Sequence, residues 1–144
     1  MIRLVRAFEV DVPAARAWAH LARVERWPSW AGHIRSVTLE PPGELSPRTT
    51  GVIRLAGGMR STFRMTRLDP PRSWLWTGRF LWLTVHYDHR FEPLTPERTR
   101  VQFVVEVTGV GAGTLGRLFR AIYARNLDRA IPALIAELEA LEDA

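Results

Sequence analysis

The chain has 144 residues, of which 47% are hydrophobic and 24% are charged, with a formal net charge of +5 and no cysteine. This composition is typical of one soluble globular domain and excludes a disordered, collagenous or coiled-coil chain. Without cysteine the chain has no disulfide, thiolate nucleophile or zinc-thiolate site, and no apolar run approaches the roughly 18 to 20 residues of a membrane span.

The positive charge comes entirely from arginine, because the chain has 20 basic residues and no lysine. Arginine keeps its charge beyond about pH 12, so a modest surplus of charge is enough to give a sequence pI of about 11.1. The arginines are scattered and form no stripe, so we expect no nucleic-acid partner. The first residues alternate charged and apolar side chains instead of forming a signal peptide, so a cytoplasmic location is expected.

The first quarter of the chain predicts a strand followed by two short helices. Residues 2–10 alternate as a strand does, and Pro13 is typical of the first turn of a helix, which we expect to end near residue 22. A second short helical segment is predicted over residues 24–27 and is expected to end at Pro28.

From Ile34 to about Val110 the hydrophobic period is two, and turn signals divide this stretch into six strands. Gly57-Gly58 predicts a tight hairpin, and Pro93 with Pro96 is expected to separate the sixth strand of the chain from the seventh. Such short connections favour an antiparallel meander.

One long helix is predicted from about Thr114 to Leu141, with Pro132 inside it. A proline in a helix removes one backbone hydrogen bond and bends the axis, so the two halves can face different parts of a curved sheet. The apolar face is expected to comprise Leu115, Leu118, Phe119, Ile122, Asn126 and Ala130, and then to drift to Leu127, Leu134, Leu138 and Leu141.

This order of elements, with the local sequences Val10-Asp11-Val12-Pro13-Ala14, Trp27-Pro28-Ser29-Trp30 and Asp69-Pro70-Pro71-Arg72, resembles the helix-grip fold of the START/Bet v 1-like (SRPBCC) superfamily. The resemblance is strongest to its bacterial polyketide cyclase/dehydrase and lipid-transport branch, and it covers residues 1–144 as a single domain. It implies an α+β fold in which a strongly curved seven-stranded antiparallel sheet wraps around the C-terminal helix. It also implies an apolar cavity between the two that accepts lipids, polyketides, quinones or similar molecules.

The alternation of side chains along each strand predicts which of them face this cavity. In the sixth strand Tyr87 and His89 are expected inside, whereas His86, Asp88 and Arg90 are expected in solvent. The predicted ligand pocket comprises Trp30, Phe63, Met65, Trp74, Trp76, Tyr87, His89, Phe103, Phe119, Tyr123 and Asn126, with His33 as a further polar candidate. An inward tyrosine or histidine is more often a core residue bonded to backbone, so the polar members have two interpretations.

Three functions remain open at this stage. The first is binding, transport or sequestration of a small hydrophobic or aromatic molecule in the cavity. The second is a cyclase/dehydratase-type enzyme in which His89 is the best candidate for a catalytic acid or base, with Tyr87 nearby. The third is a protein-interaction module, as in co-chaperone relatives of the fold. The oligomeric state stays open.

Two surface features complete the sequence predictions. His86 and Asp88 share one strand face at a spacing that suits two metal ligands, but an ion cluster with Arg90 explains them better, and we expect neither a metal nor a cofactor. The run of Phe80, Leu81 and Trp82 falls where a hairpin tip is usually polar. It predicts either a portal lip that contacts a hydrophobic ligand, a partner or, transiently, a membrane surface, or longer strands whose tip folds over the cavity mouth.

Overall fold

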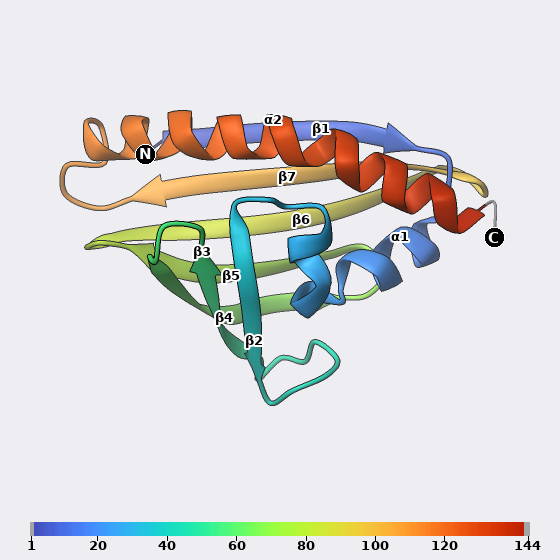
Figure 1. Cartoon of the computed structure of the whole chain (residues 1–144), viewed down its shortest axis with the longest axis horizontal. Coiled ribbons are helices and arrows are strands. Elements are labelled where there is room, and N and C mark those ends of the chain that lie inside the picture. The colour runs from blue at the N-terminus through green and yellow to red at the C-terminus, as the bar shows by residue number, and fades with distance from the viewer. Residues whose placement is uncertain (1, 143–144) are drawn as a thin grey trace.

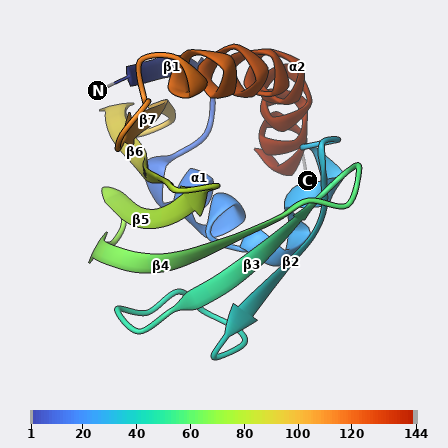
Figure 2. The same ribbon diagram turned by 90° about the vertical axis from the view of Figure 1, so that its left-hand side faces the viewer.

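Seven antiparallel strands form one curved sheet that wraps around a long C-terminal helix (Figures 1 and 2). The computed structural model describes residues 2–142, with side chains described for residues 2–140. The elements are β1 (Ile2–Val10), α1 (Ala14–Leu21), the 3-10 helix η1 (Val24–Ser29), β2 (Ile34–Glu40), β3 (Thr50–Leu55), β4 (Arg60–Asp69), β5 (Ser73–Phe80), β6 (Leu83–Thr95), β7 (Arg98–Thr108) and α2 (Leu115–Glu142). The predicted helix-grip fold is confirmed.

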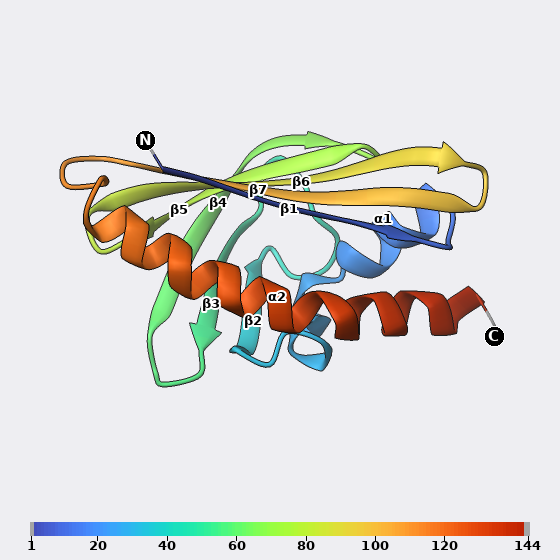
Figure 3. The same ribbon diagram turned by 90° about the horizontal axis from the view of Figure 1, so that it is seen from above.

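The strand order is β1-β7-β6-β5-β4-β3-β2, so only the pairing of β1 with β7 is non-sequential. Seen from above, β2 and β3 run across the direction of β1 and β7 (Figure 3). This accumulated twist curls the sheet and gives it a concave face. The side chains of this concave face and the inner side of α2 therefore meet in the interior.

Two prolines lie inside elements that they were expected to end. Pro28 lies within η1, and the backbone N–H groups of Trp30 and Ala31 both reach the carbonyl of Trp27. A short 3-10 helix tolerates the missing N–H because it contains few backbone hydrogen bonds, and proline removes only one of them. Pro93 lies inside β6, where the register with β7 shifts between Pro93 and Thr95. An irregularity of this kind spares the ladder hydrogen bond that proline cannot donate.

The inner side of α2 differs from the predicted apolar face in its first turns. Leu127, Leu134 and Leu138 are buried as expected, but Leu118 and Ile122 are 55% and 53% exposed. The sheet covers only the side of α2 that carries Leu115, Phe119 and Tyr123, which all pack on the core. The axis of α2 changes direction beyond its middle (Figure 1), in the half that contains Pro132. The side chain of Leu141 lies outside the described residues.

Candidate functional site

The strand register places most of the predicted pocket residues in rows on the concave face. Trp74, His89 and Phe103 are consecutive partners across β5, β6 and β7. The neighbouring row consists of Met65, Trp76, Tyr87 and Val105. Trp30 follows η1, while Phe119, Tyr123 and Asn126 lie on α2. These rows divide into a closed part and a partly open part.

The closed part is an aromatic core made of Trp27, Phe63, Trp74, Trp76, His89 and Phe103, all of them buried. The Phe63 and Trp76 rings stack with centroids 4.0 Å apart, and the Trp74 and His89 rings stack at 4.4 Å. Gly51 of β3 lies opposite Phe63 and leaves the space that this ring fills, because a Cβ there would overlap the ring. Aromatic contacts of this kind stabilise beyond their buried area.

The space left beside this core is small. A residual cavity of about 20 Å³ lies among Trp27, Trp30, Tyr87, His89 and other side chains of β6, β7 and α2. This volume holds about one water molecule, whereas cavities for drug-sized ligands measure roughly 300–1,000 Å³. The aromatic core therefore fills the deeper part of the space in which the family resemblance implied a cavity.

His89 is enclosed on several sides by rings. It stacks on Trp74 and lies within 6 Å of the ring centroids of Trp27, Trp76 and Phe103. Its Nδ1 lies 3.3 Å from the carbonyl oxygen of Trp74, so Nδ1 carries a proton and donates it to this oxygen. Burial lowers the pKa of His89 to about 4, against the smaller opposing effect of this backbone hydrogen bond. His89 is thus a neutral imidazole bonded to backbone.

The partly open part of the interior is an outer aromatic cluster of Phe80, Tyr87, Phe119 and Tyr123. Phe119 and Tyr123 stack on α2 with centroids 5.5 Å apart and an interplanar angle of 17°. Phe80 at the end of β5 approaches Phe119 at 5.0 Å, and Tyr87 of β6 approaches Tyr123 at 5.7 Å. These rings lie between sheet and helix, yet all four remain partly exposed.

The polar groups of this cluster are neutral at physiological pH. Burial raises the pKa of Tyr87, with a smaller opposing effect from its hydrogen bond with Ser61, and burial raises the pKa of Tyr123. Burial lowers the pKa of His33, whose ring lies 6.5 Å from that of Tyr123. Asn126 is partly buried one turn further along α2. Uncharged donors and acceptors beside aromatic faces suit an apolar ligand with a few oxygen atoms.

On the opposite face of β6, Asp88 is 7% exposed, so the expectation that it lies in solvent is wrong. The guanidinium groups of Arg67 and Arg90 donate to its two oxygens at 3.1 and 2.8 Å and cover it. The predicted ion cluster is confirmed. His86 instead pairs through Nδ1 with the Thr77 hydroxyl at 2.9 Å. Within residues 2–142, no group of three or more potential ligands is arranged to hold a metal ion.

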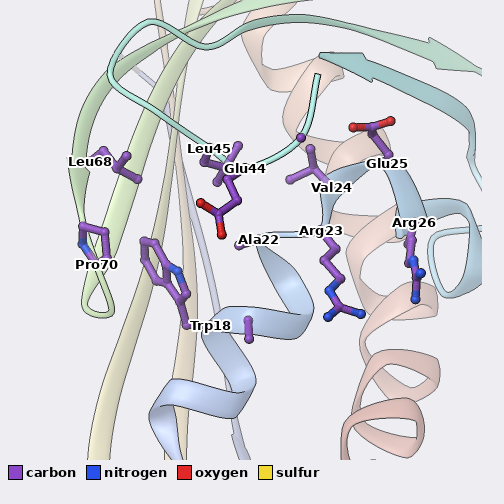
Figure 4. A pocket seen from close by; sticks show the side chains of 12 residues that line it. Trp18, Ala22, Arg23, Val24, Glu25, Arg26, Glu44, Leu45, Leu68 and Pro70 are labelled. Carbon is purple, nitrogen blue, oxygen red and sulfur yellow. The ribbon is translucent and has the colours of Figure 1, made fainter. Parts of the chain in front are cut away.

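A separate outer cleft of about 680 Å³ lies between α1, η1, the loop after β2 and the end of β4 (Figure 4). Trp18, Leu45, Leu68 and Pro70 supply its apolar walls, and the Glu44 carboxylate points toward it. The indole of Trp18 separates the cleft from the aromatic core, since it packs edge-on against Trp74 at 5.1 Å. No periodic pattern in the sequence predicts this cleft, because it forms where the irregular loop after β2 lies beside α1, η1 and the end of β4.

Comparison with known proteins places the chain in a family. The family described as "Polyketide cyclase / dehydrase and lipid transport" matches residues 1–140, so the chain belongs to it. No curated protein matches the sequence. This description agrees with the polyketide cyclase/dehydrase and lipid-transport branch that the sequence resembles.

Solved structures with the same fold have low sequence identity to this chain. A START superfamily protein from Mycobacterium smegmatis is 15% identical, with a TM-score of 0.73 over 96% of this chain and 98% of that one. The Zhui aromatase/cyclase from Streptomyces sp. R1128 is 19% identical, with a TM-score of 0.74 over 96% and 93%. A protein from Thermobifida fusca is 18% identical, with a TM-score of 0.78 over 99% and 96%. These similarities establish the fold.

No helix within residues 2–142 is both long enough and apolar enough to cross a bilayer.

Proposed function

We propose that the protein binds a small, planar, largely apolar molecule against the outer aromatic cluster, between the sheet and α2. The observation that supports this most directly is that Phe80, Tyr87, Phe119 and Tyr123 are only partly buried. Side chains held between two packed layers are normally buried, so rings that remain accessible there offer apolar surface to a ligand. Covering this surface contributes roughly 25 cal/mol per Å² removed from water, less the cost of ordering both partners.

The shape of the interior favours a compact ring system over a long acyl chain. The near-parallel Phe119 and Tyr123 rings present aromatic surface on α2. The stacked Phe63 and Trp76 rings close the deeper part of the interior, so a long chain would have to displace packed aromatic groups. Among the ligand classes implied by the fold, polyketide- or quinone-like molecules therefore fit better than lipids with long chains.

The neutral polar groups would orient such a ligand. Tyr87 and Tyr123 hold hydroxyl protons that can be donated to a carbonyl oxygen, and His33 and Asn126 add further polar atoms near the same rings. Apolar area would provide most of the affinity, and these groups would provide the specificity.

Cyclase or dehydratase activity with His89 as the acid-base group stays a prediction. His89 is enclosed by rings and has a pKa of about 4, and the cavity that it shares with Tyr87 and Tyr123 measures only about 20 Å³. The protein-interaction role also stays a prediction. Binding is the function that the partly exposed rings favour.

Titration with N-phenyl-1-naphthylamine, an uncharged fluorescent aromatic probe, tests the proposal. We expect saturable binding of one probe per chain, and Phe119→Ala should raise Kd about tenfold because it removes one face of the stack. Ala19→Trp is the matched control, since exposed Ala19 lines the outer cleft and its replacement narrows only that cleft. If Ala19→Trp weakens binding and Phe119→Ala does not, the ligand binds in the outer cleft and the proposal is wrong.

A further inference from the structure

Five of the seven large hydrophobic side chains that are exposed in the described residues gather at one end of the molecule. They form an apolar lip, defined here as Leu81, Trp82, Val110, Leu118 and Ile122. The β5–β6 turn, the β7–α2 loop and the first turns of α2, which carry these residues, all lie at the left end of Figure 1, and Figure 2 looks onto that end. Exposed apolar groups that cluster in this way mark an interaction site.

Direct contacts connect the parts of the lip. The Trp82 Nε1–H donates to the carbonyl oxygen of Val110 at 2.8 Å, which ties the β5–β6 turn to the β7–α2 loop. Phe80, next to Leu81, contacts Phe119, next to Leu118 on α2. Leu81 has φ of 55°, a backbone region in which glycine or asparagine is favoured. Leu81 and Trp82 at this tip are 59% and 63% exposed. β5 extends to Phe80 and β6 begins at Leu83, as the prediction of longer strands expects.

The segments that carry the lip have only positive charges. Residues 73–87 and 107–127 contain Arg79, Arg117, Arg120 and Arg125 and no acidic residue. The remainder of α2, residues 128–142, contains four acidic residues and one arginine. The segments at the lip are therefore apolar and basic, and the acidic residues of α2 follow them in the sequence.

A basic groove of about 410 Å³ runs between β1 and α2 beside the lip, and Arg3, Arg6, Arg117 and Arg120 line it. Arg3 and Arg6 pair with Glu106 and Asp128. Among the side chains described, Arg117 and Arg120 are exposed and form no ion pair, so their guanidinium groups are available to an external anion. Guanidinium groups match phosphate geometry and bind it with paired hydrogen bonds.

We propose that this end of the protein docks on an anionic phospholipid bilayer, with the apolar lip at the headgroup boundary and Arg117 and Arg120 on lipid phosphates. Tryptophan beside exposed leucine and isoleucine suits the membrane interface, where an apolar body and an N–H group both find partners. Each arginine near an anionic surface contributes about a fivefold gain in affinity. Docking goes beyond the proposed function and does not depend on it, although it would bring Phe80 and Phe119 close to the bilayer.

Flotation with vesicles of phosphatidylcholine alone, or with 30% phosphatidylglycerol, tests the charge requirement. We expect binding to the anionic vesicles and little to the neutral ones. Arg117→Gln with Arg120→Gln should weaken binding about 25-fold. The matched control is Arg48→Gln with Arg72→Gln, which removes the same charge from exposed loops away from the lip. If both double variants lose vesicle binding to the same extent, the effect depends only on net charge and the proposal is wrong.

A second pair of variants tests the lip. Leu81→Asn with Leu118→Gln and Ile122→Gln removes exposed apolar surface and no hydrogen bond, and it should abolish flotation. The control with methionine at the same three positions should retain it. Flotation unchanged by the polar variant would refute docking through the lip.

A concentration-dependent dimer in sedimentation velocity, lost in the polar variant, would assign the surface to a second copy and overturn the proposal. Binding of the naphthylamine probe without vesicles should be similar in all these variants, which separates this proposal from the ligand site.

Discussion

Removing the ring of Phe63 tests whether the aromatic core closes the deeper interior. Phe63 is buried, stacks on Trp76 at 4.0 Å and fills the space left by Gly51. Truncation of a buried phenylalanine to alanine costs about 3–5 kcal/mol, because apolar contacts are lost and a cavity remains. For a chain of this length each kcal/mol lowers Tm by about 2–4 °C, so Phe63→Ala should lower Tm by roughly 10 °C.

The same variant makes a second, more specific prediction. The void left by the ring extends the interior, so the naphthylamine probe should stabilise Phe63→Ala by more than it stabilises the original chain. Differential scanning fluorimetry with and without probe measures both effects, and Met59→Ala, at an exposed position on the β3–β4 hairpin, is the control that should change Tm little. A loss of stability below about 1 kcal/mol, with no added gain from the probe, would show that the core is not closed as described.

Three further predictions concern single positions. His89 has a pKa of about 4 in the folded chain and about 6.5 in the unfolded chain, so the unfolded chain takes up a proton first as the pH falls. The free energy of unfolding should therefore drop by about 2 kcal/mol between pH 7 and pH 5, and by less in His89→Phe. Urea titrations at both pH values measure this drop. Gly51→Ala should cost about 1–3 kcal/mol, also by urea titration, because its Cβ would displace Phe63, and an unchanged midpoint would contradict the close approach. Tyr87→Phe with Tyr123→Phe should leave the affinity for N-phenyl-1-naphthylamine within about threefold but weaken a hydroxynaphthoquinone about tenfold, and equal effects on both would remove the orienting role of the hydroxyls.

The order of elements and the inward face of each central strand could be predicted from the sequence. Alternation is a local property, since successive side chains of a strand point to opposite faces. Alternation places Trp74 and Trp76 on one side of β5, and the register of β5 with β6 places Tyr87 on the same side of the sheet. The turns marked by glycine and proline were also predicted from local sequence. Pro93 shows, however, that a register shift can keep a proline inside a strand.

The exposure of Leu118 and Ile122 could not be predicted from helical periodicity. Their spacing is that of a buried apolar face, and only the width of the sheet beneath α2 decides which side of that face is covered. The burial of Asp88 has a similar cause, because Arg67 reaches it from β4, 21 residues earlier in the chain.

The extent of the cavity depends on packing between distant segments. Sequence reasoning placed Phe63, Trp76 and His89 on one concave face but gave no measure of how far their rings fill it. Ring stacking across strands decides that, and it leaves about 20 Å³ beside His89. The outer cleft around Trp18 likewise depends on where the loop after β2 lies.

We propose above all that the outer aromatic cluster holds a small apolar ring compound. Native mass spectrometry of the protein purified from its own host, beside Phe119→Ala prepared in the same way, tests it most directly. We expect a retained non-covalent molecule of a few hundred daltons on the original chain and a markedly lower occupancy in the variant. The mass of the chain alone in both preparations, or equal occupancy in both, would contradict the account.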